Sequence, residues 1–114
     1  MNDKPHLDEE ALAELQDVME DEFDVLIQTY LEDSRTRIQS LRDALADADS
    51  DQFSKAAHSF KGSCVNIGAP RLGELCFDAE KLGKNDQLDQ APGVMTRIEK
   101  EFEDVAWRLQ HFNQ

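Results

Sequence analysis

The segment DQFSKAAHSFKGSCVNI, residues 51–67, decides which fold the sequence predicts. An α-helix turns by about 100° per residue, so apolar residues three or four positions apart share one side, which we expect to face a core. The residues on that side are Phe53, Ala56, Phe60, Cys64 and Ile67. His58 lies nearly opposite them, and we therefore expect its side chain to be exposed or half-exposed.

The residues around His58 on this predicted helix are Ser54, Lys55, Lys61, Gly62 and Val65, and we expect them to form the partner-binding surface. A glycine in an exposed helix interior costs about 1 kcal/mol relative to alanine. Helical side chains lean toward the N-terminus, so a side chain at position 62 would cover the imidazole. We expect Gly62 to keep His58 open to a partner protein and Val65 to be an apolar contact for it. A neutral imidazole is a competent nucleophile, and the two lysines offset added negative charge. Without other signals, however, a lone histidine between lysines commonly marks only a solvated face.

Apolar periodicity predicts helices on both sides of this segment. The five expected helices cover about residues 8–19, 22–46, 51–67, 70–84 and 92–113. Asp47–Asp51 is a predicted turn with helix-capping residues, Gly68 suits a helix C-terminus and Pro70 a first turn, and a loop is expected from Gly83 to Pro92. No segment alternates with the period of a strand. The predicted fold is all-α: one domain over residues 1–114, forming an antiparallel up-down four-helix bundle with a short additional N-terminal helix.

The charge of the chain disfavours two classes of partner. The net charge of −13 repels nucleic acid and anionic membrane surfaces. The charge is uneven, because residues 55–84 hold five basic and three acidic residues while the remainder holds seven basic and 22 acidic ones. This window is expected to tolerate extra negative charge.

No apolar run is long enough for a bilayer and no signal peptide is visible, so we expect a cytoplasmic protein.

The remaining cysteines, histidines and aromatic residues predict structural roles. Cys64 and Cys76 lack the spacing of a zinc site, and we expect two reduced, buried thiols. The three histidines lie on different segments, so no metal site and no cofactor are expected, and His6 and His111 are interpreted as solvated terminal residues. Tyr30 belongs to the core stripe of its helix. Two further aromatic residues, Phe77 and Trp107, lie off the core stripes of their helices. We expect each of them either to pack at an end of the bundle or to lie exposed on the surface.

The string His58-Ser-Phe-Lys61-Gly62-Ser63 resembles the signature of histidine-containing phosphotransfer (HPt) domains, particularly bacterial standalone ones. The similarity continues through Cys64–Ala69, then Leu72, Leu75, Cys76, Glu80, Leu82 and Gly83. It implies that His58 is phosphorylated through Nε2, that Lys61 stabilises the phosphoryl group and that Gly62 keeps the ring accessible. Ser63 is assigned to packing, and the role of Lys55 rests on geometry alone.

The resemblance also implies the partners. In this family a phosphoryl group passes from the receiver-domain aspartate of a hybrid sensor kinase to the histidine, and then to the receiver of a response regulator. The receiver supplies Mg²⁺, and the carrier has no ATP-binding or kinase domain, in agreement with the lack of a Gly-rich nucleotide loop here. We expect a monomer that meets receivers transiently.

Two alternatives remain open from the sequence. A helical adaptor that docks a regulator without chemistry would need the same bundle. A phosphoacceptor domain of a chemotaxis-type kinase would share the motif, although the short chain argues against it. Substitution of His58 separates a relay from an adaptor.

Overall fold

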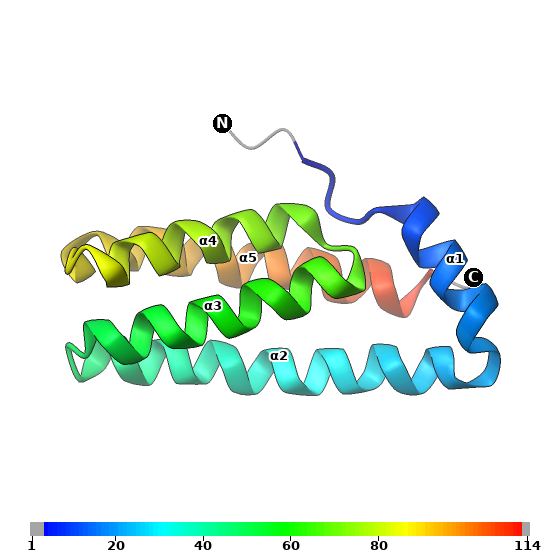
Figure 1. Cartoon of the computed structure of the whole chain (residues 1–114), viewed down its shortest axis with the longest axis horizontal. Helices are drawn as coiled ribbons and strands as arrows, with labels where there is room; N and C mark the ends of the chain where they lie inside the picture. The colour runs from blue at the N-terminus through cyan, green and yellow to red at the C-terminus, as the bar shows by residue number, and fades with distance from the viewer. Residues whose placement is uncertain (1–3, 113–114) are drawn as a thin grey trace.

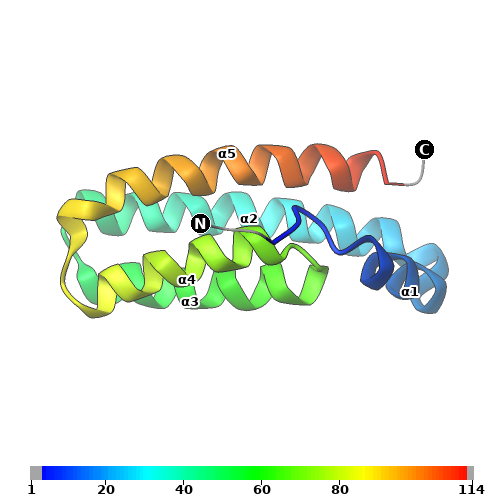
Figure 2. The ribbon, with the colours of Figure 1, turned by 90° about the horizontal axis from the view of Figure 1, so that it is seen from above.

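The computed structural model describes residues 4–112, which form five α-helices and two single-turn 3₁₀ helices (Figure 1). The elements are α1 (Glu9–Met19), η1 (Glu20–Glu22), α2 (Phe23–Ala46), α3 (Ser50–Ile67), α4 (Pro70–Lys84), η2 (Leu88–Gln90) and α5 (Ala91–Gln110). Helices α2 to α5 run alternately up and down as a four-helix bundle, and α1 lies at one end of it (Figures 1 and 2). The predicted fold class is therefore confirmed. Within residues 4–112, none of the helices combines the length and the apolar character that crossing a bilayer requires.

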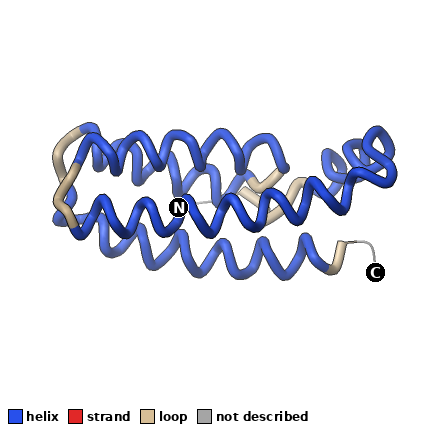
Figure 3. Tube along the Cα trace, turned by 90° about the horizontal axis from the view of Figure 1, so that it is seen from below, coloured by secondary structure: helices blue, strands red, loops and turns tan. Residues whose placement is uncertain are grey.

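Local capping explains where the helices around the central segment begin and end. The Asp49 carboxylate accepts a hydrogen bond from the backbone N–H of Gln52 at 3.0 Å and thereby caps α3. Gly68 ends α3 with a positive φ of 85°, and Pro70 opens α4. The loop expected from Gly83 to Pro92 is partly helical, because it contains η2. Helix α4 ends at Lys84, as predicted, and α5 begins at Ala91, one residue before its predicted start. Figure 3 shows how short the connections are.

The core lies between the four long helices and contains most of the predicted apolar stripe of α3. Phe53, Phe60 and Cys64 are fully buried, but Ala57 takes the core position assigned to Ala56, which is only half-buried. Tyr30 is buried as predicted, with its hydroxyl 3.3 Å from the Cys64 Sγ atom.

The two thiols, Cys64 and Cys76, are both buried and free, as the sequence predicts. A hydrogen bond with the Cys64 thiol, together with burial, raises the pKa of Cys76 above the ordinary value of a thiol. Because the thiolate is the reactive form, Cys76 is held unreactive.

Gly83 marks the closest approach of α3 and α4. A Cβ atom at this position would lie 2.8 Å from the backbone nitrogen of Ser54 and 2.9 Å from the carbonyl oxygen of Ser50. Backbone atoms cannot move aside cheaply, so we expect Gly83→Ala to destabilise the protein by about 2–3 kcal/mol. Urea unfolding measures this loss. Gly93→Ala is the control, because a Cβ atom at Gly93 meets nothing within 4 Å; equal stability of the two variants would contradict the prediction.

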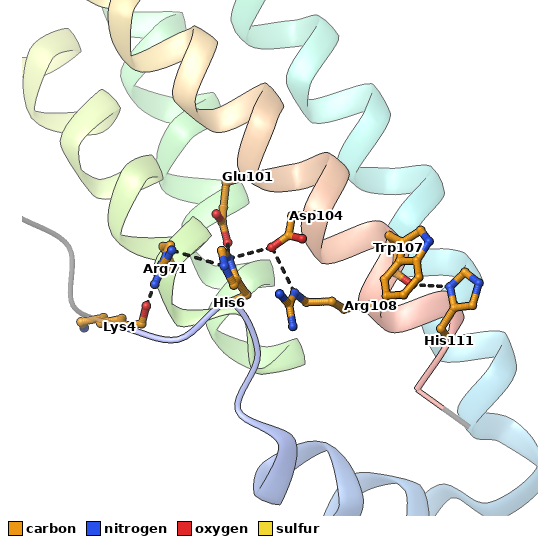
Figure 4. A network of polar contacts seen from close by, with 8 residues as sticks. All are labelled: Lys4, His6, Arg71, Glu101, Asp104, Trp107, Arg108 and His111. Atoms are coloured by element: carbon orange, nitrogen blue, oxygen red, sulfur yellow. Dashed lines mark hydrogen bonds and ion pairs between the residues drawn. The ribbon is translucent and has the colours of Figure 1, made fainter. Parts of the chain in front are cut away.

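The N-terminal arm, residues 4–8, is bound to the C-terminal end of α3, the first turn of α4 and the second half of α5. The backbone N–H of Asp8 donates to the Gly68 carbonyl at 2.8 Å, and Leu7 is buried. His6 lies with its Nδ1 atom 2.7 Å from a carboxylate oxygen of Glu101 and 2.8 Å from one of Asp104 (Figure 4). The interpretation of His6 as a solvated terminal residue is therefore wrong, because this ring joins the arm to α5.

The His6 cluster also contains groups that could ligate a metal ion, since the three side-chain ligand atoms lie within 4.8 Å of one another. Guanidinium groups adjoin it, however. An Nη atom of Arg71 lies 3.4 Å from the other nitrogen of His6, and the Arg108 Nε lies 3.1 Å from Asp104. These cations and the mutual hydrogen bonds explain the cluster as a polar fastening of the arm.

Trp107 and His111, at the C-terminal end of α5, lie on the surface. Trp107 is 60% exposed and stacks on the His111 ring with a centroid separation of 4.2 Å (Figure 4). Of the two positions left open for Trp107, the structure therefore has the exposed one, and His111 is exposed as expected.

Candidate functional site

His58 projects from the middle of α3, and its side chain is 66% exposed, in agreement with the helix geometry predicted for it. One ring nitrogen nevertheless has a partner in the protein. The Nδ1 atom lies 2.9 Å from the Oε2 atom of Glu80, which comes from α4, 22 residues further along the chain. The imidazole is therefore exposed at one nitrogen and held by the protein at the other.

Glu80 is a buried carboxylate shared by three nitrogen groups. Its side chain is only 4% exposed, and it accepts hydrogen bonds from Lys61 at 2.8 Å and Lys84 at 3.1 Å in addition to its contact with His58. Burial alone would raise the pKa of Glu80, but the hydrogen bonds from Lys61, Lys84 and His58 outweigh burial and lower the pKa to about 2. Glu80 is therefore ionised at neutral pH and can only accept hydrogen bonds.

An ionised carboxylate at Nδ1 determines where the proton of the neutral ring lies. Because Glu80 has no proton to donate, Nδ1 of His58 must carry the hydrogen of their 2.9 Å contact. A neutral imidazole has one such proton, so the lone pair is left on Nε2. The hydrogen bond also orients the ring. The arrangement presents one nucleophilic nitrogen to solvent.

Gly62 has no structural reason within the described chain for lacking a side chain. It is exposed, and a Cβ atom built on it meets nothing within 4 Å. Its place one turn after His58 leaves the approach to the ring open. The cost of this glycine in a helix interior is thus not offset by packing, which points to contact with another molecule.

Lys61 is half-buried and lies between two groups of α4. Its Nζ atom contacts Glu80 and also lies 4.9 Å from the ring centroid of Phe77. Lys81 lies over the same ring at 4.6 Å, so Phe77, which is 44% exposed, is a platform for two ammonium groups. Such cation–π contacts contribute about 0.5–1 kcal/mol at exposed sites. Phe77 therefore stands beside the site and not at an end of the bundle.

The other residues expected near His58 are divided between surface and interior. Val65 is 63% exposed on the same helix. Lys55 is exposed and pairs with Asp51 at 2.9 Å, which raises the pKa of its ammonium group. Ser54 differs from the expectation, because it is only 8% exposed and packs where Gly83 brings α4 against α3. Ser54 therefore does not belong to the open surface. Ser63 is half-buried.

The comparisons with known proteins agree with this fold and site. The family model of the Hpt domain matches residues 25–106, so the chain belongs to the Hpt domain family and is a histidine phosphotransfer protein of the kind that acts in phosphorelays. Proteins of this family are phosphocarriers without a kinase domain, and they interact with receiver domains.

One solved structure is similar over nearly its whole length. It is the crystal structure of histidine-containing phosphotransfer protein B (HptB) from Pseudomonas aeruginosa, with a TM-score of 0.91 and 40% sequence identity, covering 94% of this chain and 93% of that chain. The chain is thus HptB-like, and the resemblance of its motif to HPt domains is confirmed. A comparison with curated protein sequences gave no match.

Glu80→Gln is expected to slow phosphoryl transfer roughly 10-fold to 100-fold, the range observed where a carboxylate orients a metal-binding histidine. The amide can donate to Nδ1 as well as accept from it, so rings with the proton on Nε2 become populated. Transfer kinetics measure the rate, and ¹⁵N NMR of His58 measures the position of the proton. Glu103→Gln, at an exposed glutamate of α5, is the control. An unchanged NMR spectrum of the ring together with a slow rate would contradict this positioning role.

The same substitution tests the pH dependence of stability. The folded-state pKa of Glu80, about 2, lies below the value of 4.5 for an unperturbed carboxyl, so its contribution is complete above about pH 4.5 and is lost as the pH falls toward 2. We expect this contribution to be on the order of 2 kcal/mol, since two of the partners are largely exposed to solvent. Urea unfolding at several pH values should show a shallower acid-side decline for Glu80→Gln than for the wild type.

Proposed function

We propose that His58 accepts a phosphoryl group from the aspartyl phosphate of a receiver domain in a hybrid sensor kinase and passes it to the receiver aspartate of a response regulator. The observation that carries this proposal is the exposed imidazole of His58, whose contact between Nδ1 and the ionised Glu80 leaves the lone pair on Nε2. The two free thiols suit a cytoplasmic relay, because thiols stay reduced in that compartment.

Each transfer is one balanced displacement at phosphorus. The Nε2 lone pair of His58 attacks, an N–P bond forms, and the P–O bond to the aspartate breaks with its electron pair leaving on the carboxylate. The second transfer reverses these changes on another receiver. We assign the neutralisation of the receiver's leaving carboxylate to the Mg²⁺ bound by the receiver. The carrier itself needs no metal or nucleotide for this step.

Three nearby residues are assigned supporting roles. Lys61 and Lys84 already lie on Glu80, beside the ring, so their ammonium groups are close to the added phosphoryl charge. Gly62 leaves space for the partner above the ring. A non-catalytic adaptor would use the same exposed surface, but it has no need for a buried carboxylate that keeps a proton on Nδ1.

The test is transfer from a panel of receiver domains phosphorylated with acetyl phosphate. We expect intact-protein mass spectrometry to show the addition of one phosphoryl group, and peptide mapping to place it on His58. The modification should survive alkali and be lost in acid, as a phosphoramidate is. A group found on another residue would contradict the assignment of His58. Absence of transfer from every receiver, with the chain folded, would favour the adaptor.

A further inference from the structure

We propose that the docking surface extends from His58 to α1 and that the acidic face of α1 selects receivers carrying a cluster of lysine or arginine residues at the corresponding edge of their own docking surface. This inference rests on the proposed function and adds the chemistry of the preferred partner. Three features support it: a groove that begins at His58, apolar side chains that line this groove as far as α1, and carboxylates of α1 that have no ion-pair partner among residues 4–112.

A groove of about 640 Å³ connects His58 with α1. It runs between α2 and α3, and its walls include His58 and Gly62 at one end and Leu15 and Met19 of α1 at the other. Leu26 contributes a further half-buried apolar side chain. A protein that covers His58 from the side left open by Gly62 therefore also covers this groove and contacts α1.

A second groove, of about 540 Å³, lies on the other side of α3 and reaches the same helix. Lys61 and Phe77 line it near the site, and Leu15 is shared with the first groove. The exposed Val65 belongs to its wall. The C-terminal half of α3 is therefore a ridge between two grooves, and both end under α1.

The α1 segment is strongly acidic and has no basic residue. Residues 8–24 contain nine Asp or Glu residues, all exposed, and no Lys, Arg or His. Glu10, Glu14 and Asp17, at i, i+4 and i+7, share one stripe of the helix and form no ion pair with any residue from 4 to 112. Like charges at this spacing destabilise a helix. Val18, which is 81% exposed, lies next to this stripe.

The two ends of the surface therefore differ in charge. Lysines adjoin His58 on the α4 side, where the acidic phosphorylation site of a receiver must be placed. The carboxylates of α1, in contrast, form no ion pair within the described part of the chain. A partner with a basic cluster over α1 is attracted by the α1 carboxylates, and a partner with an acidic edge is repelled by them. Complementary charge of this kind raises the association rate and penalises wrong partners. The same polarity fixes the orientation in which a receiver approaches the ring.

The experiment compares two charge reversals with the same change in net charge. Glu14→Lys/Asp17→Lys alters the α1 stripe, and Asp47→Lys/Glu103→Lys alters exposed acids away from both grooves. The probe is the receiver domain that transfers fastest to the wild type, phosphorylated with acetyl phosphate. We expect kcat/KM to fall about 10-fold for the α1 variant and less than about 2-fold for the control at low ionic strength, with the difference vanishing in 0.5 M salt.

The outcomes separate this inference from the proposed function. Equal rates for the two variants, or a faster α1 variant, would overturn the role of the acidic stripe while leaving transfer to His58 intact. A loss confined to the α1 variant but independent of salt would also overturn it, because a charge contact must be screened. Absence of transfer to the wild type from every receiver would overturn the proposed function itself. Circular dichroism of both variants verifies folding.

Discussion

Replacing His58 with glutamine is expected to leave the bundle folded and to reduce phosphoryl acceptance by at least about 1,000-fold, which corresponds to roughly 4 kcal/mol of lost transition-state stabilisation. Glutamine can still form a hydrogen bond with Glu80, but its amide nitrogen has no available lone pair for attack on phosphorus. The His58 side chain is 66% exposed and packs little, so we expect a change in unfolding free energy below about 1 kcal/mol. Transfer kinetics and urea unfolding of the same preparation measure both quantities.

The matched control for this substitution is His111→Gln. That histidine is also exposed and hydrogen-bonded through Nδ1, but to the backbone carbonyl of Trp107 at 2.7 Å on α5. Its loss should leave the transfer rate unchanged. Equal rates for the wild type and His58→Gln would show that the phosphoryl group is carried elsewhere.

A leucine at Gly62 is expected to stop transfer while making the protein slightly more stable. Its side chain leans back along α3 toward His58 and excludes the partner from the ring. Nothing within 4 Å opposes a Cβ atom at this position, and leucine favours a helix over glycine by about 0.8 kcal/mol. We expect a fall in kcat/KM of at least about 100-fold. Transfer kinetics with a phosphorylated receiver test the loss of transfer, and thermal unfolding tests the gain in stability.

Two controls make this result specific. Gly62→Ala should gain the same stability with a much smaller loss of rate, because one methyl group does not reach over the ring. Gly93→Leu places an identical side chain at another open glycine, on α5. Transfer by Gly62→Leu at the wild-type rate would remove the reason proposed for this glycine.

Local sequence signals predicted the helices and the exposure of His58 because both depend on residues near in sequence. Capping by Asp49 and Gly68 involves neighbours within a few positions, and the angular position of His58 follows from the repeat of α3 alone. The end of α4 at Lys84 was predicted as well, but the reason for Gly83 was not. A glycine is needed there because Ser54, from a distant part of the chain, approaches it.

The functions of Glu80 and His6 could not be predicted from the same signals. Each depends on a partner from a distant segment: Glu80 on His58, 22 residues away, and His6 on Glu101, 95 residues away. The rotation of α4 and α5 about their axes decides whether these side chains meet, and periodicity leaves that rotation uncertain by a residue. The family motif includes Glu80, but only the packing of α3 against α4 explains its presence.

The hydrogen bond between Glu80 and His58 also has a consequence for detection of the modified protein. Phosphohistidine exists as two regioisomers, substituted at Nδ1 or at Nε2, which differ in stability and in recognition by antibodies. Since Nδ1 is occupied by the buried carboxylate, the chain should form the Nε2 regioisomer alone. An antibody specific for that regioisomer should therefore detect the full signal, and an antibody for the other should detect none.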